Sequence, residues 1–264
     1  MNGPSGHRAR KRFGQNFLSD PNVVRRIVEA VRPLPGETVV EIGPGLAALT
    51  EPLVERLGHL HVVEIDRDLI ARLHERFTPV QLTIHEGDAL RFDFATLPAP
   101  LRVVGNLPYN ISTPLLFHLA DFAARVHDMT FMLQKEVVMR MVAAPDTPDY
   151  GRLSVMLQYR FRMARLFDVP PGAFRPAPKV VSSIVRLVPR PAAELAARDE
   201  ALMARIVAAA FGQRRKTLRN TLREFLAERD FAALGIDANL RGERLAVGDY
   251  VTIANYVAGR LTAS

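Results

Sequence analysis

The chain has 264 residues, 48% of them hydrophobic and 24% charged, which is ordinary for a folded globular protein. It contains no cysteine, and this excludes disulfides, thiolate zinc sites, iron–sulfur clusters and cysteine nucleophiles together. No uninterrupted apolar run reaches the roughly 18 residues of a spanning helix, and the N-terminus lacks the apolar segment of a secretory signal, so we expect a cytoplasmic protein with no membrane contact.

The net charge of +7 is concentrated in two segments. Residues 1–19 carry no acidic residue and contain Arg8, Arg10, Lys11 and Arg12. Residues 211–223 also carry no acidic residue and contain Arg214, Arg215, Lys216, Arg219 and Arg223. Such segments are either solvated surfaces or contacts with a polyanion, and nucleic acid is the natural candidate.

Strand-like and helix-like stretches alternate from residue 20 to about 130, which predicts a parallel sheet covered on both faces. The first helix begins with Asp20 as its N-cap and Pro21 at its first position. Two further helices are expected at 46–58, closed by Gly58, and at 68–77. We expect strands, in chain order, at 38–43, 59–66, 81–88, 101–106, 129–133, 153–161 and 181–188.

The pattern changes at Pro189-Arg190-Pro191, which interrupts regular structure. Beyond it, residues 192–211 and 216–228 are helical in composition and period, and nothing strand-like follows. We therefore expect an α/β, Rossmann-like domain over residues 1–188, which includes the basic N-terminal segment 1–19, and a small all-α domain over residues 189–264.

Four predicted strands end in groups that suit a nucleoside. Gly43 and Gly45 follow the first strand, so the backbone there can approach a ligand closely and present N–H groups to it. Glu64 ends the second strand at a separation typical of an acid that takes up ribose hydroxyls. Asp88 ends the third strand, where a carboxylate accepts a hydrogen bond from an adenine amino group.

The glycine loop alone leaves the cofactor open, because G-P-G-L-A-A also fits a dinucleotide fingerprint and a tight strand-to-helix turn needs glycine anyway. The fourth strand end distinguishes NAD from S-adenosylmethionine. A dehydrogenase needs a hydride partner and a polarising acid, and "NLPY" at 106–109 supplies neither. This segment suits an exocyclic amine, which favours S-adenosylmethionine.

The chemistry of "NLPY" follows from its residue types. An aromatic amine is a poor nucleophile until acceptors around its N–H groups localise the lone pair, and the Asn106 carbonyl is one acceptor. Leu107 is held extended by the following proline, which fixes nearby main-chain carbonyls, and Pro108 has no N–H to compete. Tyr109 offers a face on which a base stacks. The alternative is an asparagine–proline turn with a core tyrosine.

The leaving group would be a sulfonium ion, which is already charged, so no strong general base is needed. In-line placement of amine and methyl group contributes up to roughly 7 to 11 kcal/mol in favourable cases. We therefore predict that positioning supplies most of the catalysis.

Nearly the whole chain resembles the rRNA adenine N6-dimethyltransferases, and within them the bacterial small-subunit (16S) branch of the kasugamycin-sensitivity type. The motif "NLPYNISTPLL" at 106–116 is highly specific for this family, whereas the glycine loop by itself is not. The matching segments are "GQNFLSD", "EIGPGLAALT", "VVEID", "EGDAL", "GNLPYNISTPLLFHL", "FMLQKEV", "YGRLSVMLQY" and "FRPAPKVVSSIVRL".

The resemblance implies roles for further residues. Gln15, Asn16 and Leu18 would line the methionine end of the cofactor, and Phe174 would stack on the flipped target adenine opposite Tyr109. Without the resemblance, Phe174 would be interpreted as a core aromatic. A base must leave its stack to be reached in this way, at a cost of a few kcal/mol. The cofactor-binding set is then completed by Gly43, Gly45, Glu64, Ile65, Asp88, Ala89 and Asn106.

Two positions depart from the usual pattern. Ala47 stands at the last glycine of G-x-G-x-G, although this branch tolerates alanine there, and Val181 stands where relatives often have aspartate. The alanine at position 47 slightly weakens the interpretation of the glycine loop as a nucleotide site, and the valine at position 181 concerns only a local contact.

The second basic segment has a helical spacing. Arg215, Arg219 and Arg223 recur every four residues beside Leu218, Leu222 and Phe225, so one helix would pack inward and present a cationic face. In the family context we expect it to bind rRNA phosphates. The predicted RNA-binding set is Arg214, Arg215, Lys216, Arg219 and Arg223.

The expected reaction is transfer of methyl groups to N6 of two adjacent adenosines near the 3′ end of 16S rRNA, on the immature 30S subunit. One site per chain gives no reason for a dimer, so a monomer is expected.

His59 and His61 are two residues apart on a predicted strand, but no third potential ligand lies at a spacing typical of a metal site, so we predict no metal. The rivals are a 23S rRNA enzyme of the macrolide-resistance type, a mainly non-catalytic assembly factor, and an N6-adenine DNA methyltransferase.

Overall fold

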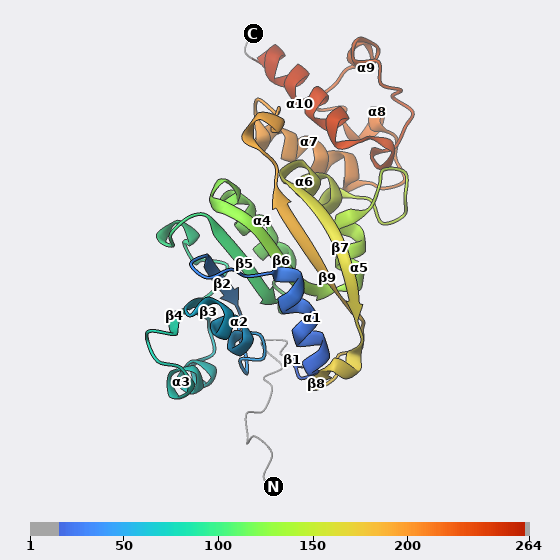
Figure 1. Cartoon of the computed structure of the whole chain (residues 1–264). Coiled ribbons are helices and arrows are strands. Elements are labelled where there is room, and N and C mark those ends of the chain that lie inside the picture. Colours follow the sequence, from blue (N-terminus) through green and yellow to red (C-terminus); the bar gives the residue numbers. More distant parts are fainter. Residues whose placement is uncertain (1–15, 262–264) are drawn as a thin grey trace. The chain divides into compact units, whose positions relative to one another are not determined.

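The computed structural model describes residues 16–261, which form two compact units (Figure 1). The first unit comprises the residues up to 138 together with 164–189, and the second comprises 139–163 together with the residues from 190 onward. The chain therefore leaves the first unit after Val138 and returns at Ala164. The second division, after Pro189, lies one residue beyond the boundary expected from the sequence, whereas the segment 139–163 was expected in the first domain.

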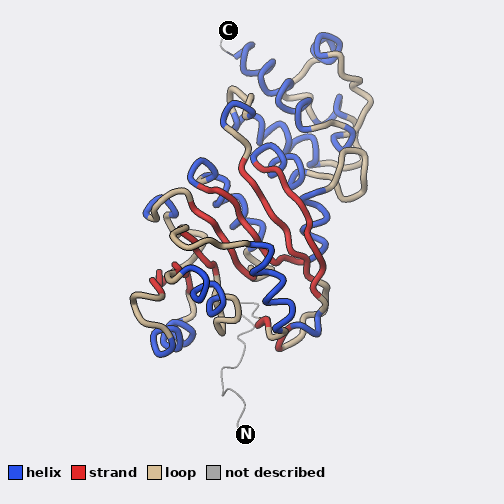
Figure 2. Tube along the Cα trace, viewed as in Figure 1, coloured by secondary structure: helices blue, strands red, loops and turns tan. Residues whose placement is uncertain are grey.

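A seven-stranded sheet is the centre of the first unit, and its strands lie side by side in Figure 2. The strand order is β4-β3-β2-β5-β6-β9-β7. Neighbours from β4 to β6 are parallel, whereas β9 is antiparallel to β6. The strands are β2 (Thr38–Ile42), β3 (Leu60–Glu64), β4 (Leu82–Glu86), β5 (Leu101–Asn106), β6 (Val126–Gln134), β7 (Phe161–Val169) and β9 (Ser182–Pro189).

The chain reverses its direction of winding at β2, because β3 lies on one side of it and β5 on the other. Ligands of open α/β sheets bind outside the carboxyl ends of the strands at such a switch point. The sheet and its helices form the predicted α/β, Rossmann-like fold, and the predicted fold class is confirmed.

Helices of the first unit begin and end where the sequence places signals. Asp20 caps the first helix, since its Oδ1 accepts a hydrogen bond from the Asn22 N–H at 2.8 Å, and Gly58 ends the second helix in the left-handed conformation at φ 80°. Buried residues of the first three helices join those of β2, β3 and β4 in one core cluster. The helices are α1 (Pro21–Val31), α2 (Thr50–Leu57), α3 (Arg67–Arg76) and α4 (Ser112–Asp121), with 3₁₀ turns at Phe94–Thr96 and Ala123–Arg125.

A separate two-stranded sheet brings two distant motifs together. β1 (Phe17–Leu18) pairs antiparallel with β8 (Phe174–Arg175), so that Leu18 is opposite Phe174. Ser19 continues the contact, because its N–H donates to the Ala173 carbonyl at 2.8 Å. A 3₁₀ turn at Pro171–Ala173 precedes β8.

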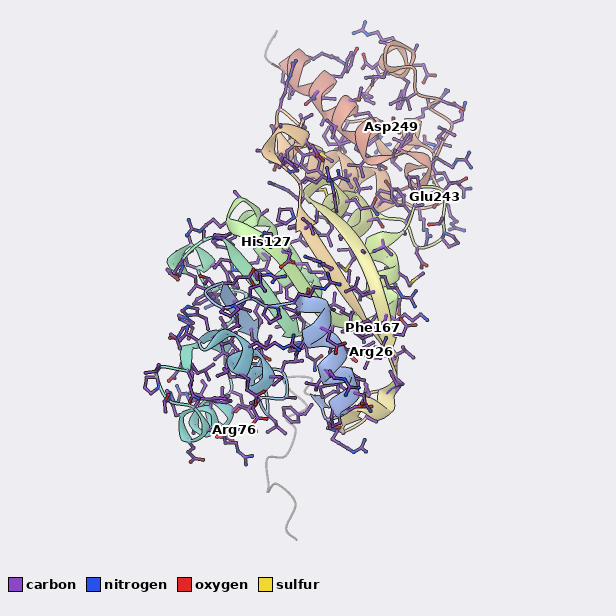
Figure 3. All side chains as sticks on the ribbon, in the orientation of Figure 1. Arg26, Arg76, His127, Phe167, Glu243 and Asp249 are labelled. Carbon is purple, nitrogen blue, oxygen red and sulfur yellow. The ribbon has the colours of Figure 1, made fainter. Side chains whose placement is uncertain are left out.

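A buried arginine attaches α1 to the sheet. Arg102 of β5 pairs with both carboxylate oxygens of Asp128 of β6, at 2.8 and 2.9 Å. It also donates to the carbonyls of Val31 and Arg32 at the C-terminal end of α1, and to Glu37. The pairing holds the pKa of Asp128 below its usual range, despite its burial. In the middle of α1, the guanidinium of Arg26 lies 4.0 Å from the centre of the Phe167 ring (Figure 3).

The second unit is helical and has its own core. Buried side chains of five of its helices and the connecting turns form one apolar cluster, with Tyr150 and Tyr250 among the largest. Its helices are α6 (Arg152–Arg160), α7 (Glu200–Gly212), α8 (Leu218–Thr221), α9 (Glu228–Leu234) and α10 (Val247–Leu261), and α5 (Lys135–Val142) precedes them in the chain. Short 3₁₀ turns lie at Ala192–Glu194 and Gly242–Arg244.

The strand predicted at 153–161 is wrong, because this segment forms α6 and the next strand, β7, begins at Phe161. Apart from Met156, its apolar residues alternate with polar ones, which is the period of a strand. In the helix, Val155 and Tyr159 are four residues apart and both enter the core of the second unit. Ser154 accepts a hydrogen bond from the Gly151 N–H at 3.0 Å, and this contact closes the first turn.

The single helix predicted at 216–228 is also wrong, because α8 covers only Leu218–Thr221. Two of the three predicted apolar residues, Leu218 and Leu222, are fully buried, whereas Phe225 is only partly buried and Leu226 beside it is 4% exposed. The periodicity therefore identified the buried side of the segment, while the backbone after α8 makes tight turns. Within residues 16–261, no helix has the length and apolar character needed to cross a membrane.

Replacement of Arg102 by alanine is expected to destabilise the first unit by about 3 kcal/mol, because Asp128, which is 2% exposed, would keep only the partly exposed Arg186 as an ion-pair partner. Urea unfolding followed by circular dichroism measures the loss. Arg76→Ala is the matched control: Arg76 pairs with Glu51 at the surface, so it is expected to cost about 1 kcal/mol or less. Equal losses in the two variants would contradict the anchoring role of Arg102.

Candidate cofactor-binding and active site

The carboxyl ends of β2, β3 and β5 and the loop after β4 surround a cavity of about 200 Å³. All of its lining residues belong to the first unit. Every described residue of the predicted cofactor set lines it, namely Asn16, Leu18, Gly43, Gly45, Glu64, Ile65, Asp88, Ala89 and Asn106. Gln15, the remaining member, lies outside the described residues.

The glycine loop after β2 needs its glycines. Gly43 and Gly45 have φ angles of 66° and 59°, in the left-handed region that favours glycine. A Cβ on Gly45 would also lie 3.1 Å from the Phe17 ring, so β1 packs directly on the loop. Ala47 is left-handed as well, at φ 68°, which shows that the third position of the pattern keeps a glycine-like conformation with an alanine.

Main-chain groups orient the acid at the end of β3. Glu64 is 6% exposed, and its Oε1 accepts hydrogen bonds from the Ile65 and Asp66 N–H groups, both at 2.9 Å. Burial raises the pKa of Glu64, although these hydrogen bonds and one from the Gly45 N–H oppose the shift. A carboxylate fixed in this way is a suitable acceptor for a pair of ribose hydroxyls.

The loop after β4 has the features expected of an adenine site. Asp88 uses Oδ1 to accept the Leu90 N–H at 2.9 Å, which fixes the carboxylate at the cavity. Ile65 lines the same cavity but is 48% exposed, so a planar ligand bound there would cover an otherwise solvated apolar side chain. The donor and acceptor set therefore fits the adenosine part of S-adenosylmethionine.

One hydrogen bond sets the orientation of Asn106. Its Nδ2 donates to the main-chain carbonyl of Asn16 at 3.1 Å. A carbonyl only accepts, so the amide nitrogen must be the atom that faces it, and Oδ1 is the carboxamide atom available to accept from a bound amine. Asn106 thus has the orientation required for the predicted acceptor role.

The approach of β5 to β2 places Asn106 beside the glycine loop. A Cβ on Gly105 would lie 2.6 Å from the Ile42 carbonyl, so only glycine permits this spacing. Leu107 is 1% exposed, and its N–H donates to the Met132 carbonyl of β6 at 3.2 Å. The segment after β5 is therefore attached to β6, while Gly105 brings the end of β5 close to β2.

Tyr109 lines the cavity and is only partly buried. Its hydroxyl lies 2.8 Å from Ser182 Oγ, and burial raises its pKa. Its carbonyl accepts a hydrogen bond from Ser112 Oγ at 3.1 Å, at the start of α4. Of the two predicted stacking aromatics, Tyr109 is the one that reaches the cavity.

Phe174 does not reach the cavity. Its side chain is 1% exposed and packs in the core cluster of the first unit, as the alternative interpretation of a core aromatic requires. In this conformation Phe174 is not available for stacking on a base, and the predicted role requires that the ring leave the core. The contact that it does make is the strand pairing with Leu18.

Glu41 is a cavity residue that sequence reasoning missed. It is 2% exposed and accepts a hydrogen bond from Thr50 Oγ1 at 2.7 Å. Burial and the nearby Glu64 raise its pKa to about 7. The available signal was an acid inside the otherwise apolar strand "TVVEI", two residues before the first glycine.

The predicted RNA-binding cations divide into two groups. Arg214 bonds to the Pro148 carbonyl and lies 3.6 Å from Glu243, and Arg219 pairs with Glu228 at 2.9 Å. Across residues 16–261, no ion pair involves the exposed side chains of Arg215, Lys216 or Arg223. These three cations lie on the turns around α8 rather than on one helix face, which corrects the predicted helical stripe.

The histidines pair with each other and with a threonine. His59 Nε2 lies 2.9 Å from Thr83 Oγ1, and His61 Nδ1 lies 3.2 Å from His85 Nε2. Burial and the other two histidines lower the pKa of His61 to about 4, which keeps it neutral. The described part of the chain holds no group of three or more ligand-type side chains suited to a metal ion.

Comparison with known proteins gives consistent matches along the chain. The family model described as "Ribosomal RNA adenine dimethylase" matches residues 6–259. A protein of Aromatoleum aromaticum named "Ribosomal RNA small subunit methyltransferase A" is 81% identical over 256 residues, 97% of both chains. A protein of the same name from Thiobacillus denitrificans is 65% identical over 96% of this chain and 100% of its own.

Two solved structures share the fold over both units. A dimethyladenosine transferase from Plasmodium falciparum has a TM-score of 0.80 at 22% identity, over 92% of this chain and 98% of its own. The 23S rRNA methyltransferase ErmE has a TM-score of 0.70 at 26% identity, over 92% of this chain and 100% of its own.

Glu41 is expected to make the affinity for S-adenosylmethionine depend on pH. A cationic ligand favours the carboxylate, so affinity should rise by about tenfold between pH 6 and pH 8, as Glu41 loses its proton. Among residues 16–261, no histidine lines the cavity. Isothermal titration across this range measures the effect, and Glu41→Gln should remove it. S-adenosylhomocysteine, which lacks the sulfonium charge, should show a weaker dependence; an equal slope for both ligands would contradict this role.

Proposed function

Because this chain belongs to the ribosomal RNA adenine dimethylase family, we propose that it transfers methyl groups from S-adenosylmethionine to N6 of two adjacent adenosines near the 3′ end of 16S rRNA. The product is N6,N6-dimethyladenosine, formed during small-subunit assembly. The observation that carries the proposal is the orientation of Asn106, whose Oδ1 is presented at the cavity as an acceptor for the target amine.

The cofactor would lie along the strand ends. Glu64 would accept the ribose hydroxyls, Asp88 the adenine amino group, and the Gly43 loop would pass under the methionine part. When bound, S-adenosylmethionine supplies an electrophilic methyl group on a sulfonium ion. The protein's task is then to bring the target nitrogen into line with that methyl group.

Asn106 and the chain that follows it would perform this task. Oδ1 accepts one N–H of the target amine, a main-chain carbonyl of the extended segment accepts the other, and the nitrogen lone pair becomes localised. Tyr109 would stack on the flipped base, a contact worth about 1 to 3 kcal/mol. The Asn106 carboxamide is not basic, so the proton released on each transfer passes to solvent.

The similarity to the small-subunit enzymes favours 16S rRNA over 23S rRNA as the substrate. Identity is 81% to the small-subunit methyltransferase of Aromatoleum aromaticum and 26% to the 23S rRNA enzyme ErmE. Primer extension on both rRNAs after incubation with the protein tests this choice. Modification of 23S rRNA alone would overturn it, and activity on duplex DNA would revive the DNA methyltransferase alternative.

The helical residues from 189 onward are proposed to bind RNA through the cations around α8. Arg215, Lys216 and Arg223 support this assignment, because exposed cations without ion pairs are available to phosphates. We further infer that the protein acts on the immature 30S subunit, as a monomer, in the cytoplasm. The complete cavity within one chain supports action as a monomer.

Asn106→Ala is expected to lower the rate of methyl transfer by at least about 100-fold, since it removes the acceptor that positions the amine. Binding to undermethylated small subunits should be retained. Tritiated methyl incorporation and subunit co-sedimentation measure the two properties. Asn22→Ala, an exposed asparagine on α1, is the control and should retain activity.

A near-normal rate for Asn106→Ala would show that this carboxamide does not position the amine. Wild-type protein that binds subunits but transfers no methyl group would instead support the alternative of a non-catalytic assembly factor.

A variant in which Arg215, Lys216 and Arg223 are alanine is expected to bind rRNA more weakly and with less salt dependence. The slope of log affinity against log salt should fall by roughly 0.7 to 0.9 for each phosphate that the variant no longer neutralises. Filter binding between about 50 and 300 mM salt, a range that includes physiological ionic strength, measures this slope. The control replaces Arg162 and Arg244, which pair with Glu194 and Asp146. An equal change in slope for the control would contradict a specific role for the α8 cations.

A further inference from the structure

Tyr109 lies in a turn between β5 and α4 and needs an interaction that fixes its ring. The main chain is held by the hydrogen bonds from Ser112 Oγ to the Tyr109 carbonyl and from the Ile111 N–H to the Pro108 carbonyl. The side chain is held at the far end of the ring, where the hydroxyl lies 2.8 Å from Ser182 Oγ. The position of the ring at the cavity therefore depends on where Ser182 lies.

Ser182 belongs to a strand of the sheet, whereas the tyrosine that it contacts lies in a turn. It is 0% exposed and is opposite Gln134 in the antiparallel pairing of β9 with β6. On its N-terminal side, the Val181 carbonyl accepts the Lys135 N–H at 2.9 Å. The Ser182 hydroxyl is thus a fixed point of the sheet, about 70 residues along the chain from Tyr109.

The neighbouring serine makes a different contact. Side chains alternate between the two faces of a strand, so Ser183 is directed away from Tyr109. Its hydroxyl donates to Asp168 Oδ1 at 2.5 Å, and Asp168 also pairs with Lys135 at 2.8 Å. Ser182 and Ser183 are both fully buried, yet only Ser182 contacts the cavity-lining aromatic.

We propose that Ser182 is a positioning residue for the methyl transfer: its hydroxyl fixes the Tyr109 ring at the cavity, in the place where the target adenine stacks. This role rests on the proposed function. Ser182 is not among the residues that line the cavity and does not contact the cofactor region directly. It acts through the tyrosine, so its loss should affect turnover and leave the affinity for S-adenosylmethionine unchanged.

The size of the expected effect follows from the geometry. Without its partner, the Tyr109 hydroxyl would be left partly buried and unsatisfied, which favours movement of the ring toward solvent. Misplacement of a positioning group by about 1 Å can lower a rate by up to 100-fold. We expect Ser182→Ala to lower kcat by about 10- to 100-fold, while the cofactor Kd changes by less than about twofold.

The test compares Ser182→Ala, Tyr109→Phe and the double variant, with undermethylated small subunits as substrate and thermal unfolding as a check of folding. Tyr109→Phe retains the ring and removes only the hydroxyl, so it breaks the same hydrogen bond without altering β9. All three variants should have similarly low kcat values, because each removes one and the same hydrogen bond. Ser183→Ala, which removes the adjacent buried hydroxyl, should retain the wild-type kcat even if its stability falls.

A kcat for Tyr109→Phe within twofold of wild type would overturn the proposal, even if Ser182→Ala failed to fold. Fully additive losses in the double variant, or an equal loss of kcat in Ser183→Ala, would also overturn it. Failure of the proposed function is a separate result, because wild-type protein would then transfer no methyl group to the subunits.

Discussion

The hydrogen bond from Asn106 Nδ2 to the Asn16 carbonyl is the contact on which the site depends. It joins β5 to the segment that leads into β1, and it determines which atom of the carboxamide faces a ligand. An asparagine rotated the other way would present N–H donors to an amine that also carries N–H groups. Asn16 and Leu18 both line the cavity, so this one interaction links the proposed acceptor for the substrate to the proposed cofactor site.

The sheet makes that interaction possible. β2 and β5 are parallel neighbours at the point where the winding reverses, and Gly105 lets the two backbones approach so closely that any Cβ would collide with Ile42. Arg102 fixes the opposite end of β5 to β6 and α1. β5 is thus fixed at both ends: a buried ion pair holds its beginning, and the close approach to β2 holds its end, which carries the proposed acceptor Asn106.

The sequence allowed most strands, their ends and the described cofactor residues of the cavity to be predicted, because each depends on local signals: apolar runs, glycines at left-handed positions and polar residues at the ends of strands. The failures concern contacts between distant residues. The alternation in residues 153–161 is compatible with a strand until Val155 and Tyr159 find a helical core to enter. Phe174 is in a motif typical of base recognition, but its burial follows from the pairing with β1. Ser182 gives no signal in the sequence, because its partner is in another motif.

The pairing of β1 with β8 would connect the two proposed binding events. Leu18 lines the cavity, and its strand partner Phe174 belongs to the segment proposed to contact the target base. A swing of the phenylalanine out of the core would disturb the ribbon that holds Leu18, while a seated cofactor would brace that ribbon from the other side. The free energy of this single rearrangement would then contribute to the binding of both ligands, so that binding of one would change the affinity for the other.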